Sequence, residues 1–163
     1  MKYADGPTTE VAVFIAAPVE RIWEVVVDIN LPAEFSEEFL GAEWVDGGPA
    51  LGAHFKGRNR HDSLGEWETT SCVNLYEPTR AFGWAVGDPD NPSATWWFLL
   101  DEQDGGVRVR QGGRMGPAPS GLTYAITAMP DKEDRIVARR LQEWERNMRA
   151  TLEGLKLRLE GGA

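Results

Sequence analysis

The alternation of apolar and polar residues predicts short strands over the first two thirds of the chain. Residues 8–16 are rich in β-branched side chains and predict a first strand. Six further runs with a period of two are separated by turn residues such as Asp, Gly and Pro, which is typical of strands joined by tight loops. These runs are 42–45, 53–61, 67–76, 80–86, 94–100 and 107–111. No helical segment interrupts them, so we expect an antiparallel meander.

Apolar residues at helical spacing occur at both ends of this strand region and predict helices there. Pro18 opens a segment that predicts a helix, and residues 33–40, ended by Gly41, predict a second short helix. A loop is expected at 112–121. From Pro130 onward the spacing predicts one amphipathic helix of about 28 residues, about 40 Å long, which must cover an apolar sheet face. Its apolar stripe consists of Ile136, Val137, Leu141, Trp144, Met148, Leu152, Leu155 and Leu159.

Composition and charge narrow the class of protein. With 163 residues, 42% hydrophobic and 26% charged, the chain is expected to form a single domain over residues 1–163 with a core at about 8–159. The net charge of −9 repels phosphate backbones, so nucleic acid is not an expected partner. Cys72 is the only cysteine, and neither a signal peptide nor a membrane span is visible. We expect a cytoplasmic monomer or homodimer with no integral membrane association.

Three local stretches carry a resemblance to a known family. They are residues 15–23 (IAAPVERIW), residues 52–60 (GAHFKGRNR), and Trp67 followed by Thr69-Thr70 and Glu77-Pro78. With the order of elements, they resemble the START-like, birch-pollen-allergen-like (SRPBCC) superfamily, in its bacterial polyketide cyclase/dehydrase-like branch. The resemblance implies an α+β helix-grip fold. In that fold a curved antiparallel sheet of about seven strands, with two short helices after the first strand, wraps around a long C-terminal helix.

The resemblance also implies a pocket between the concave sheet face and the long helix. Alternation along each strand then indicates which side chains point into the pocket. Tyr124 is placed at the rim of the pocket. Trp144 and Met148 of the long helix complete its wall. The candidate ligand-binding residues are Phe55, Asn59, His61, Trp67, Thr69, Trp84, Trp96, Phe98, Gln111, Tyr124, Trp144 and Met148. An aromatic lining with a few polar points suits rings or acyl chains. For each aromatic residue taken singly, core packing without any ligand is the favoured explanation, because any sheet needs an apolar face.

The polar candidates have alternatives of their own. The amides of Asn59 and Gln111 need hydrogen-bond partners, which either a ligand or the neighbouring backbone would supply. His61 stands beside Asp62, where a solvated turn residue is favoured over a general base. Trp96 and Trp97 must point to opposite faces, so Trp97 is either exposed, as at an interface, or covered.

Motifs for several chemistries are missing. Two histidines and one cysteine do not form a zinc set, and no phosphate loop, dinucleotide fingerprint or nucleophile elbow is present. We therefore expect no metal and no cofactor. Acid/base chemistry on a bound ring by His61, Glu66 or Glu68 remains open.

Three functions remain open. The leading hypothesis is binding of a hydrophobic small molecule (a lipid, an aromatic compound or a polyketide-like ring), with titratable groups only at the cavity rim. A polyketide cyclase, aromatase or dehydratase would instead need at least two mutually hydrogen-bonded titratable groups deep inside. A co-chaperone-like interaction protein would have a filled cavity and an exposed patch around Trp97.

Overall fold

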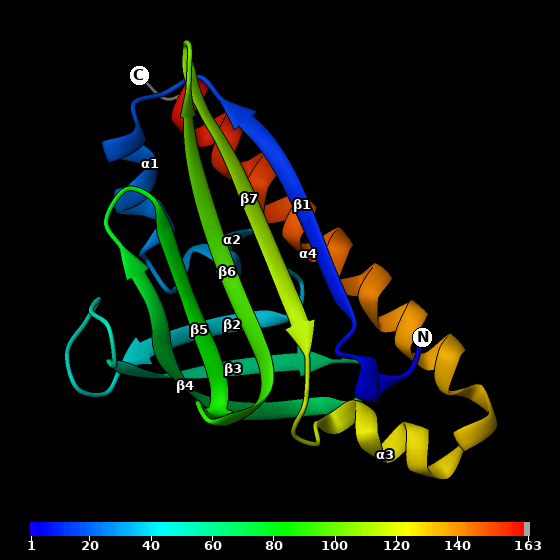
Figure 1. Cartoon of the computed structure of the whole chain (residues 1–163). Coiled ribbons are helices and arrows are strands. Elements are labelled where there is room, and N and C mark those ends of the chain that lie inside the picture. Colours follow the sequence, from blue (N-terminus) through cyan, green and yellow to red (C-terminus); the bar gives the residue numbers. More distant parts are fainter. Residues whose placement is uncertain (162–163) are drawn as a thin grey trace.

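A curved sheet of seven strands forms one side of the molecule, and a long helix lies across its concave face (Figure 1). The computed structural model describes residues 1–161. The strands are β1 (Thr8–Ile15), β2 (Phe39–Trp44), β3 (His54–His61), β4 (Gly65–Glu77), β5 (Ala81–Asp88), β6 (Asn91–Gln103) and β7 (Gly106–Met115). The helices are α1 (Val19–Val26), α2 (Leu31–Phe35), α3 (Gly121–Ala128) and α4 (Glu133–Gly161), with 3₁₀ turns at Tyr3–Asp5 and Pro130–Lys132. The predicted helix-grip fold is confirmed.

The sheet is a fully antiparallel meander that curls strongly. Its order is β1-β7-β6-β5-β4-β3-β2, so that β1 closes one edge beside β7. The register shifts in β2–β3, β4–β5 and β5–β6, and such bulges bend the strand and increase its twist. As Figure 1 shows, β2 and β3 consequently cross the direction of β6 and β7 steeply. The concave face is deep enough to receive a helix.

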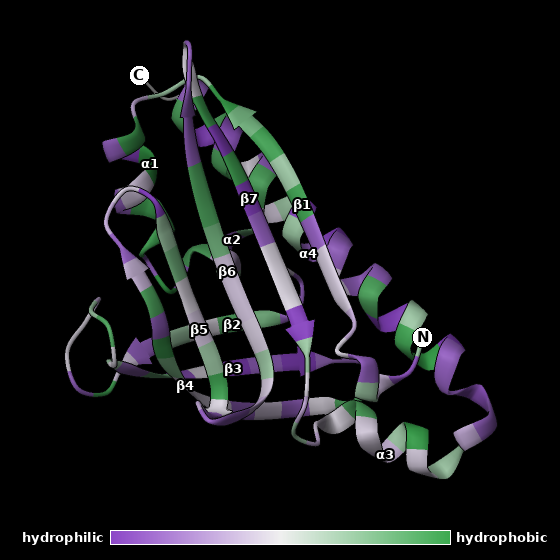
Figure 2. Cartoon of the chain, viewed as in Figure 1, coloured by the Kyte–Doolittle hydropathy of each residue, from purple (hydrophilic) through white to green (hydrophobic). Residues whose placement is uncertain are grey.

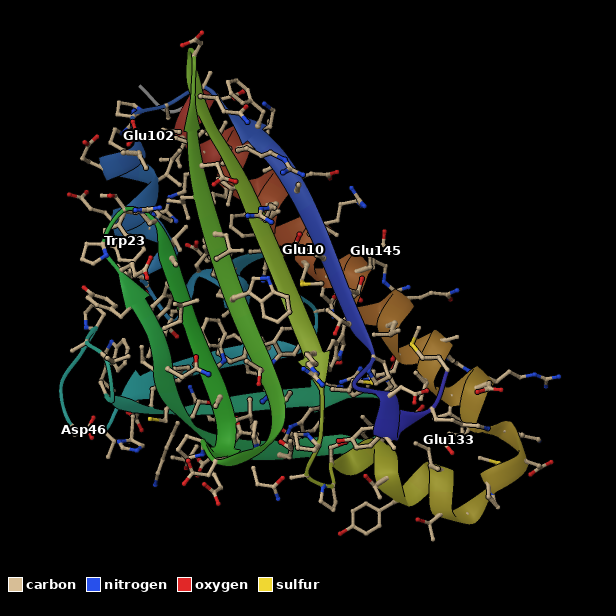
Figure 3. All side chains as sticks on the ribbon, in the orientation of Figure 1. Glu10, Trp23, Asp46, Glu102, Glu133 and Glu145 are labelled. Carbon is tan, nitrogen blue, oxygen red and sulfur yellow. The ribbon has the colours of Figure 1, made fainter. Side chains whose placement is uncertain are left out.

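One end of the interior is a filled core. Trp23 of α1 (Figure 3) packs edge-on against Phe82, with ring centroids 6.4 Å apart, and Ile15, Ile22 and Leu155 are fully buried. Figure 2 shows apolar residues on α1 and on the last part of β1, beside the final turns of α4. Close packing of this kind is the main source of stability in a small domain.

Helix α4 is attached to the rest of the chain near both of its ends. Near its C-terminal end, Lys156 Nζ donates to the Phe14 carbonyl (2.6 Å), and the Ala16 N–H donates to Glu160 Oε2 (2.8 Å). At its start, Glu133 (Figure 3) accepts the Tyr3 N–H (2.8 Å). Between these points α4 lies mainly against β1 and α2. Between its ends the helix reaches the sheet through side chains, as where Trp144 meets Trp96 of β6.

The second short helix differs from the prediction over 33–40. Helix α2 covers Leu31–Phe35, and the chain enters β2 already at Phe39. Pro32 lies in the first turn of α2, where the missing N–H costs nothing. Gly41 has a φ of 144° inside β2, so it belongs to the bulge and is not a helix cap.

The loop predicted for 112–121 is also wrong in its first part. Gly112 and Gly113 belong to β7. The indoles of Trp97 and Trp96 lie over them on opposite faces and leave no room for side chains, which explains why these strand positions are glycines. The apolar pattern does not predict α3. This helix begins at a capping box, in which Ser120 Oγ accepts the Leu122 N–H and Thr123 Oγ1 accepts the Ser120 N–H (2.9 Å).

The close approach at Gly113 gives a stability prediction. A Cβ there would lie 2.5 Å from the Trp96 ring and 3.2 Å from Trp144, so Gly113→Ala should destabilise the protein by about 1–3 kcal/mol through overpacking. The control is Gly121→Ala, whose Cβ meets only Leu64 at 3.9 Å and should be neutral or slightly stabilising. Urea unfolding measures both variants, and equal stability of the two would contradict the packing argument.

Candidate functional site

A cavity of about 610 Å³ lies between the concave sheet face and the middle of α4, from Arg140 to Thr151. This volume falls within the range of small-molecule sites. Most of the proposed ligand-binding residues line it, namely Phe55, Asn59, Trp67, Thr69, Trp84, Trp96, Gln111, Tyr124, Trp144 and Met148. Tyr124 on α3 is 82% exposed and stands at the edge of the cavity. Figure 1 shows α3 at the opposite end of the molecule from the β6–β7 hairpin, so the cavity opens away from the filled core.

Two aromatic groups shape the wall. Trp84 lies at the centre of the first, with Phe55 at 5.7 Å and Phe98 at 6.3 Å between ring centroids. In the second, Trp96 of β6 meets Trp144 of α4 at 4.2 Å and an interplanar angle of 46°. This second pair bridges sheet and helix directly, over the bare backbone of Gly113. The rings are fixed by packing and present a preformed apolar surface.

Polar atoms interrupt the apolar wall at a few points. Ser71 and Gln111 line the cavity and are almost fully buried. In residues 1–161, Gln111 Oε1 is one of only two buried side-chain polar atoms without a hydrogen-bond partner. Thr151, by contrast, donates to the Asn147 carbonyl at 3.0 Å. Leaving a buried acceptor unpaired costs about 1–3 kcal/mol, so Gln111 is a wall residue whose oxygen the surrounding protein leaves without a hydrogen bond.

A network of hydrogen-bonded side chains begins at the cavity wall, which Arg140 and Glu38 line. Arg140 of α4 is 8% exposed and forms a bidentate pair with Glu38, with Nη1 to Oε1 at 2.7 Å and Nη2 to Oε2 at 2.8 Å. Nη1 also donates to Glu143 Oε1 at 3.1 Å, and Glu143 Oε2 meets His61 Nε2 at 2.9 Å. The network joins the α2–β2 connection, α4 and the end of β3.

The hydrogen bonds define donors and acceptors in this network. The Ser63 N–H donates to His61 Nδ1 at 3.0 Å, so Nε2 is the ring nitrogen that faces and donates to Glu143. Burial by itself would raise the pKa of Glu143, but the hydrogen bonds from His61 and Arg140 outweigh it and hold that pKa below its ordinary value. Burial likewise opposes the charge of Arg140, and the bonds from Glu38 and Glu143 raise its pKa overall.

Several proposed residues lie outside the cavity wall. Phe98 is 1% exposed and packs in the core behind Trp84. His61 is neither a wall residue nor a freely solvated turn residue, because it is bonded to Glu143. Glu66 and Glu68, considered for acid/base chemistry, are exposed and stand opposite Arg60 and Arg58 in the sheet.

Sequence reasoning missed Arg140, although the sequence contains a signal for it. Arg140 follows Val137 by three residues and precedes Trp144 by four, so it interrupts the apolar stripe of the last helix. An arginine in a buried stripe requires a carboxylate partner. Its partner Glu38 is 102 residues away, and local spacing does not reveal such a pair.

The Trp97 side chain lies on the convex face of the sheet and lies flat against the neighbouring strand β7. Its indole packs over Gly112, and Nε1 donates to Glu10 Oε2 at 2.9 Å. Arg110 lies on the same face, 3.4 Å from Asp101 and 3.7 Å from Glu10. The Trp97 side chain is therefore half-buried in a hydrogen-bonded setting.

Among residues 1–161, no three His, Cys, Asp or Glu side chains are grouped so that they could hold a metal ion. None of the helices within that range is both long enough and apolar enough to span a membrane.

Solved structures share this fold. A Polyketide_cyc-like protein from Corynebacterium glutamicum is 29% identical, with a TM-score of 0.66 over 95% of this chain and 94% of that one. The di-domain ARO/CYC protein BexL of the BE-7585A biosynthetic pathway is 16% identical, with a TM-score of 0.70 over 94% of this chain and 50% of its own. Ara h 8.0201 is 15% identical, with a TM-score of 0.54 over 90% of this chain and 98% of its own.

No curated protein matches the sequence. A family model described as "Polyketide cyclase / dehydrase and lipid transport" matches residues 7–160, nearly the whole chain. With this match added to the helix-grip fold and its cavity, the chain belongs to the polyketide cyclase/dehydrase and lipid transport family.

Proposed function

We propose that this protein binds a hydrophobic small molecule in the cavity between the sheet and α4. The observation that carries the proposal is an aromatic-walled space of about 610 Å³ beside a core that is otherwise tightly filled. The family description names both polyketide chemistry and lipid transport, and each involves a largely apolar molecule.

Core packing alone does not account for the cavity. Protein interiors are close-packed, and voids much larger than a water molecule are few. A volume of about 610 Å³ corresponds to about 20 waters at about 30 Å³ each. If water fills the cavity, the apolar surfaces of Trp84, Trp96 and Met148 stay hydrated. The protein then loses a favourable free energy of about 25 cal/mol for each Å² of apolar surface that a ligand would remove from water. An apolar ligand recovers this free energy.

Catalysis is the second candidate function, and the Glu38–Arg140–Glu143–His61 network is the observation that favours it. Its members are mutually hydrogen-bonded, as an enzyme of the cyclase or dehydratase type would require. Among the wall residues, however, only Glu38 and Arg140 are charged, and they are paired with each other. A lowered pKa keeps Glu143 deprotonated at neutral pH, which suits a structural clamp better than a general acid.

The co-chaperone-like hypothesis has the least support. It requires a filled cavity and an exposed patch around Trp97, whereas the cavity is open and Trp97 is hydrogen-bonded to Glu10. Binding therefore remains the proposed function, with a partner that is a small molecule.

The direct test is native mass spectrometry of the protein purified from its own host, followed by denaturing extraction. We expect a co-purifying apolar compound that is lost on denaturation. A clean apo mass, together with no thermal shift across a panel of lipids and aromatic polyketides, would refute the proposal. An extracted compound can then be incubated with the protein to test for turnover.

A cavity-filling variant gives a second prediction. Ser71 is buried, lines the cavity and lies between Phe55 and Val86 in the sheet. Ser71→Leu should weaken binding of the identified ligand by about tenfold or more, because the new side chain occupies its space. Thr70→Leu, on the exposed opposite face of the same strand, is the matched control and should bind normally. Isothermal titration calorimetry measures both, and equal affinities would place the ligand elsewhere.

The clamp interpretation of the network predicts a pH dependence. Because the pKa of Glu143 is lowered in the folded state, its contribution to stability is present above about pH 4.3, the ordinary glutamate pKa, and is lost as pH falls through the lowered value. The difference in unfolding free energy between wild type and Glu143→Gln should therefore be largest near neutral pH and shrink in acid. Glu145→Gln, which removes an exposed pair with Arg149, is the control. A difference that stays constant with pH would contradict the assignment.

A further inference from the structure

Helix α4 carries a row of arginines on its solvent-exposed side. The row, called the arginine stripe below, consists of Arg135, Arg139, Arg146 and Arg149, and all of them are exposed. Because an α-helix turns by about 100° per residue, their spacings of four, seven and three residues keep them within about 80° of the helix circumference. The stripe is about 21 Å long at about 1.5 Å per residue.

Three members of the stripe lack a partner in the described part of the chain. Within residues 1–161, no salt bridge or hydrogen bond involves the guanidinium group of Arg135, Arg139 or Arg146. Arg149 alone is paired, with Glu145 at 3.0 Å, and both of these side chains are about half exposed. The net charge of the chain is −9, so the stripe is a local positive site on a molecule that is negative as a whole.

The hydrogen-bonded network at the cavity wall explains why this charge stays unpaired. Glu143 follows Arg139 by four residues and precedes Arg146 by three, which is the spacing at which side chains of a helix meet. Its two carboxylate oxygens are bound instead by Arg140 and His61. The carboxylate that could neutralise the centre of the stripe is therefore used on the cavity side of α4.

We propose that the arginine stripe is a docking site for an acidic helix of a partner protein. Guanidinium groups bind carboxylates in a bidentate geometry, and a second helix that crosses α4 at a shallow angle stays in contact with it over several turns. The complex is transient, because each exposed ion pair adds little free energy and is screened by salt. The stripe lies opposite Trp144 and Met148, which line the cavity, so this docking site is separate from the proposed ligand site.

The observations favour an acidic protein over an anionic membrane or a nucleic acid. The latter two are extended, so they also face the acidic surface around the stripe, and the net charge of −9 repels them. A membrane surface binds most strongly where apolar side chains insert beside the basic ones. The other exposed residues on this side of α4, between Arg135 and Arg149, are Ala138, Gln142 and Glu145, which provide no large apolar group.

Defined probes test the proposal. One stapled helical peptide carries glutamates on a single face, and a second has the same composition with the glutamates distributed around the helix. In fluorescence anisotropy at about 50 mM salt, the one-face peptide should bind at least about fivefold tighter than the second, and about 300 mM salt should weaken its binding about tenfold. Vesicles of phosphatidylcholine with about 30% phosphatidylglycerol, and a DNA duplex of about 20 base pairs, should bind more weakly than the one-face peptide.

A double variant tests the residues responsible. Arg139→Gln/Arg146→Gln removes the two central charges and should weaken binding of the one-face peptide about fivefold or more. Its thermal unfolding midpoint should change little, because both side chains are exposed. The matched control, Arg80→Gln/Arg108→Gln, removes the same charge at exposed positions outside α4 and should bind the peptide as wild type does.

Four outcomes would overturn the proposal. They are no binding of the one-face peptide, equal affinity for the two peptides, tighter binding of the vesicles or the duplex than of the one-face peptide, and equal losses in the two double variants. Equal affinity for the peptides would reduce the stripe to a non-specific attraction for anions. Equal losses in the variants would show that the net charge, and not the stripe, determines binding.

Discussion

A straight helix cannot follow a curved sheet along its whole length, and this mismatch determines the rest of the structure. Helix α4 is bonded near its C-terminal end to the chain around Phe14 and Ala16, and at its start to Tyr3. Between these attachments the central strands are bent by bulges, and they meet the helix mainly through long side chains such as Trp96. Side chains fill the gap where α1 adds a further layer. Where no such layer exists, the gap remains as the cavity.

This arrangement separates the source of stability from the proposed site of binding. The filled end supplies the apolar burial on which a domain of this size depends, and the hollow end can therefore be shaped for a ligand. The hollow end still needs a fastening, which the Glu38–Arg140–Glu143–His61 network provides by linking three segments that are distant in sequence. A buried ion pair gives little net stability, but it holds its partners in a defined geometry because breaking it is costly.

The fold and much of the cavity wall could be predicted from the sequence because strand alternation is a local property. A period of two decides that Phe55 and Asn59 share a face, whatever the rest of the chain does. The pairing of Arg140 with Glu38 depends on two segments meeting in space, and alternation does not report it. The local sequence does not predict the strand conformation of Gly112 and Gly113 for a related reason. Their bare backbone is required by indoles of the neighbouring strand, whereas glycines read locally indicate a loop.

The contact between Trp96 and Trp144 has a consequence for observing this molecule in solution. Two indoles 4.2 Å apart and inclined at 46° are close enough for their electronic transitions to couple, and this coupling produces a paired signal in circular dichroism. One ring belongs to the sheet and the other to α4, so the signal depends on the separation between the two layers. The circular dichroism signal of this tryptophan pair therefore reports the distance between α4 and the sheet without any added label.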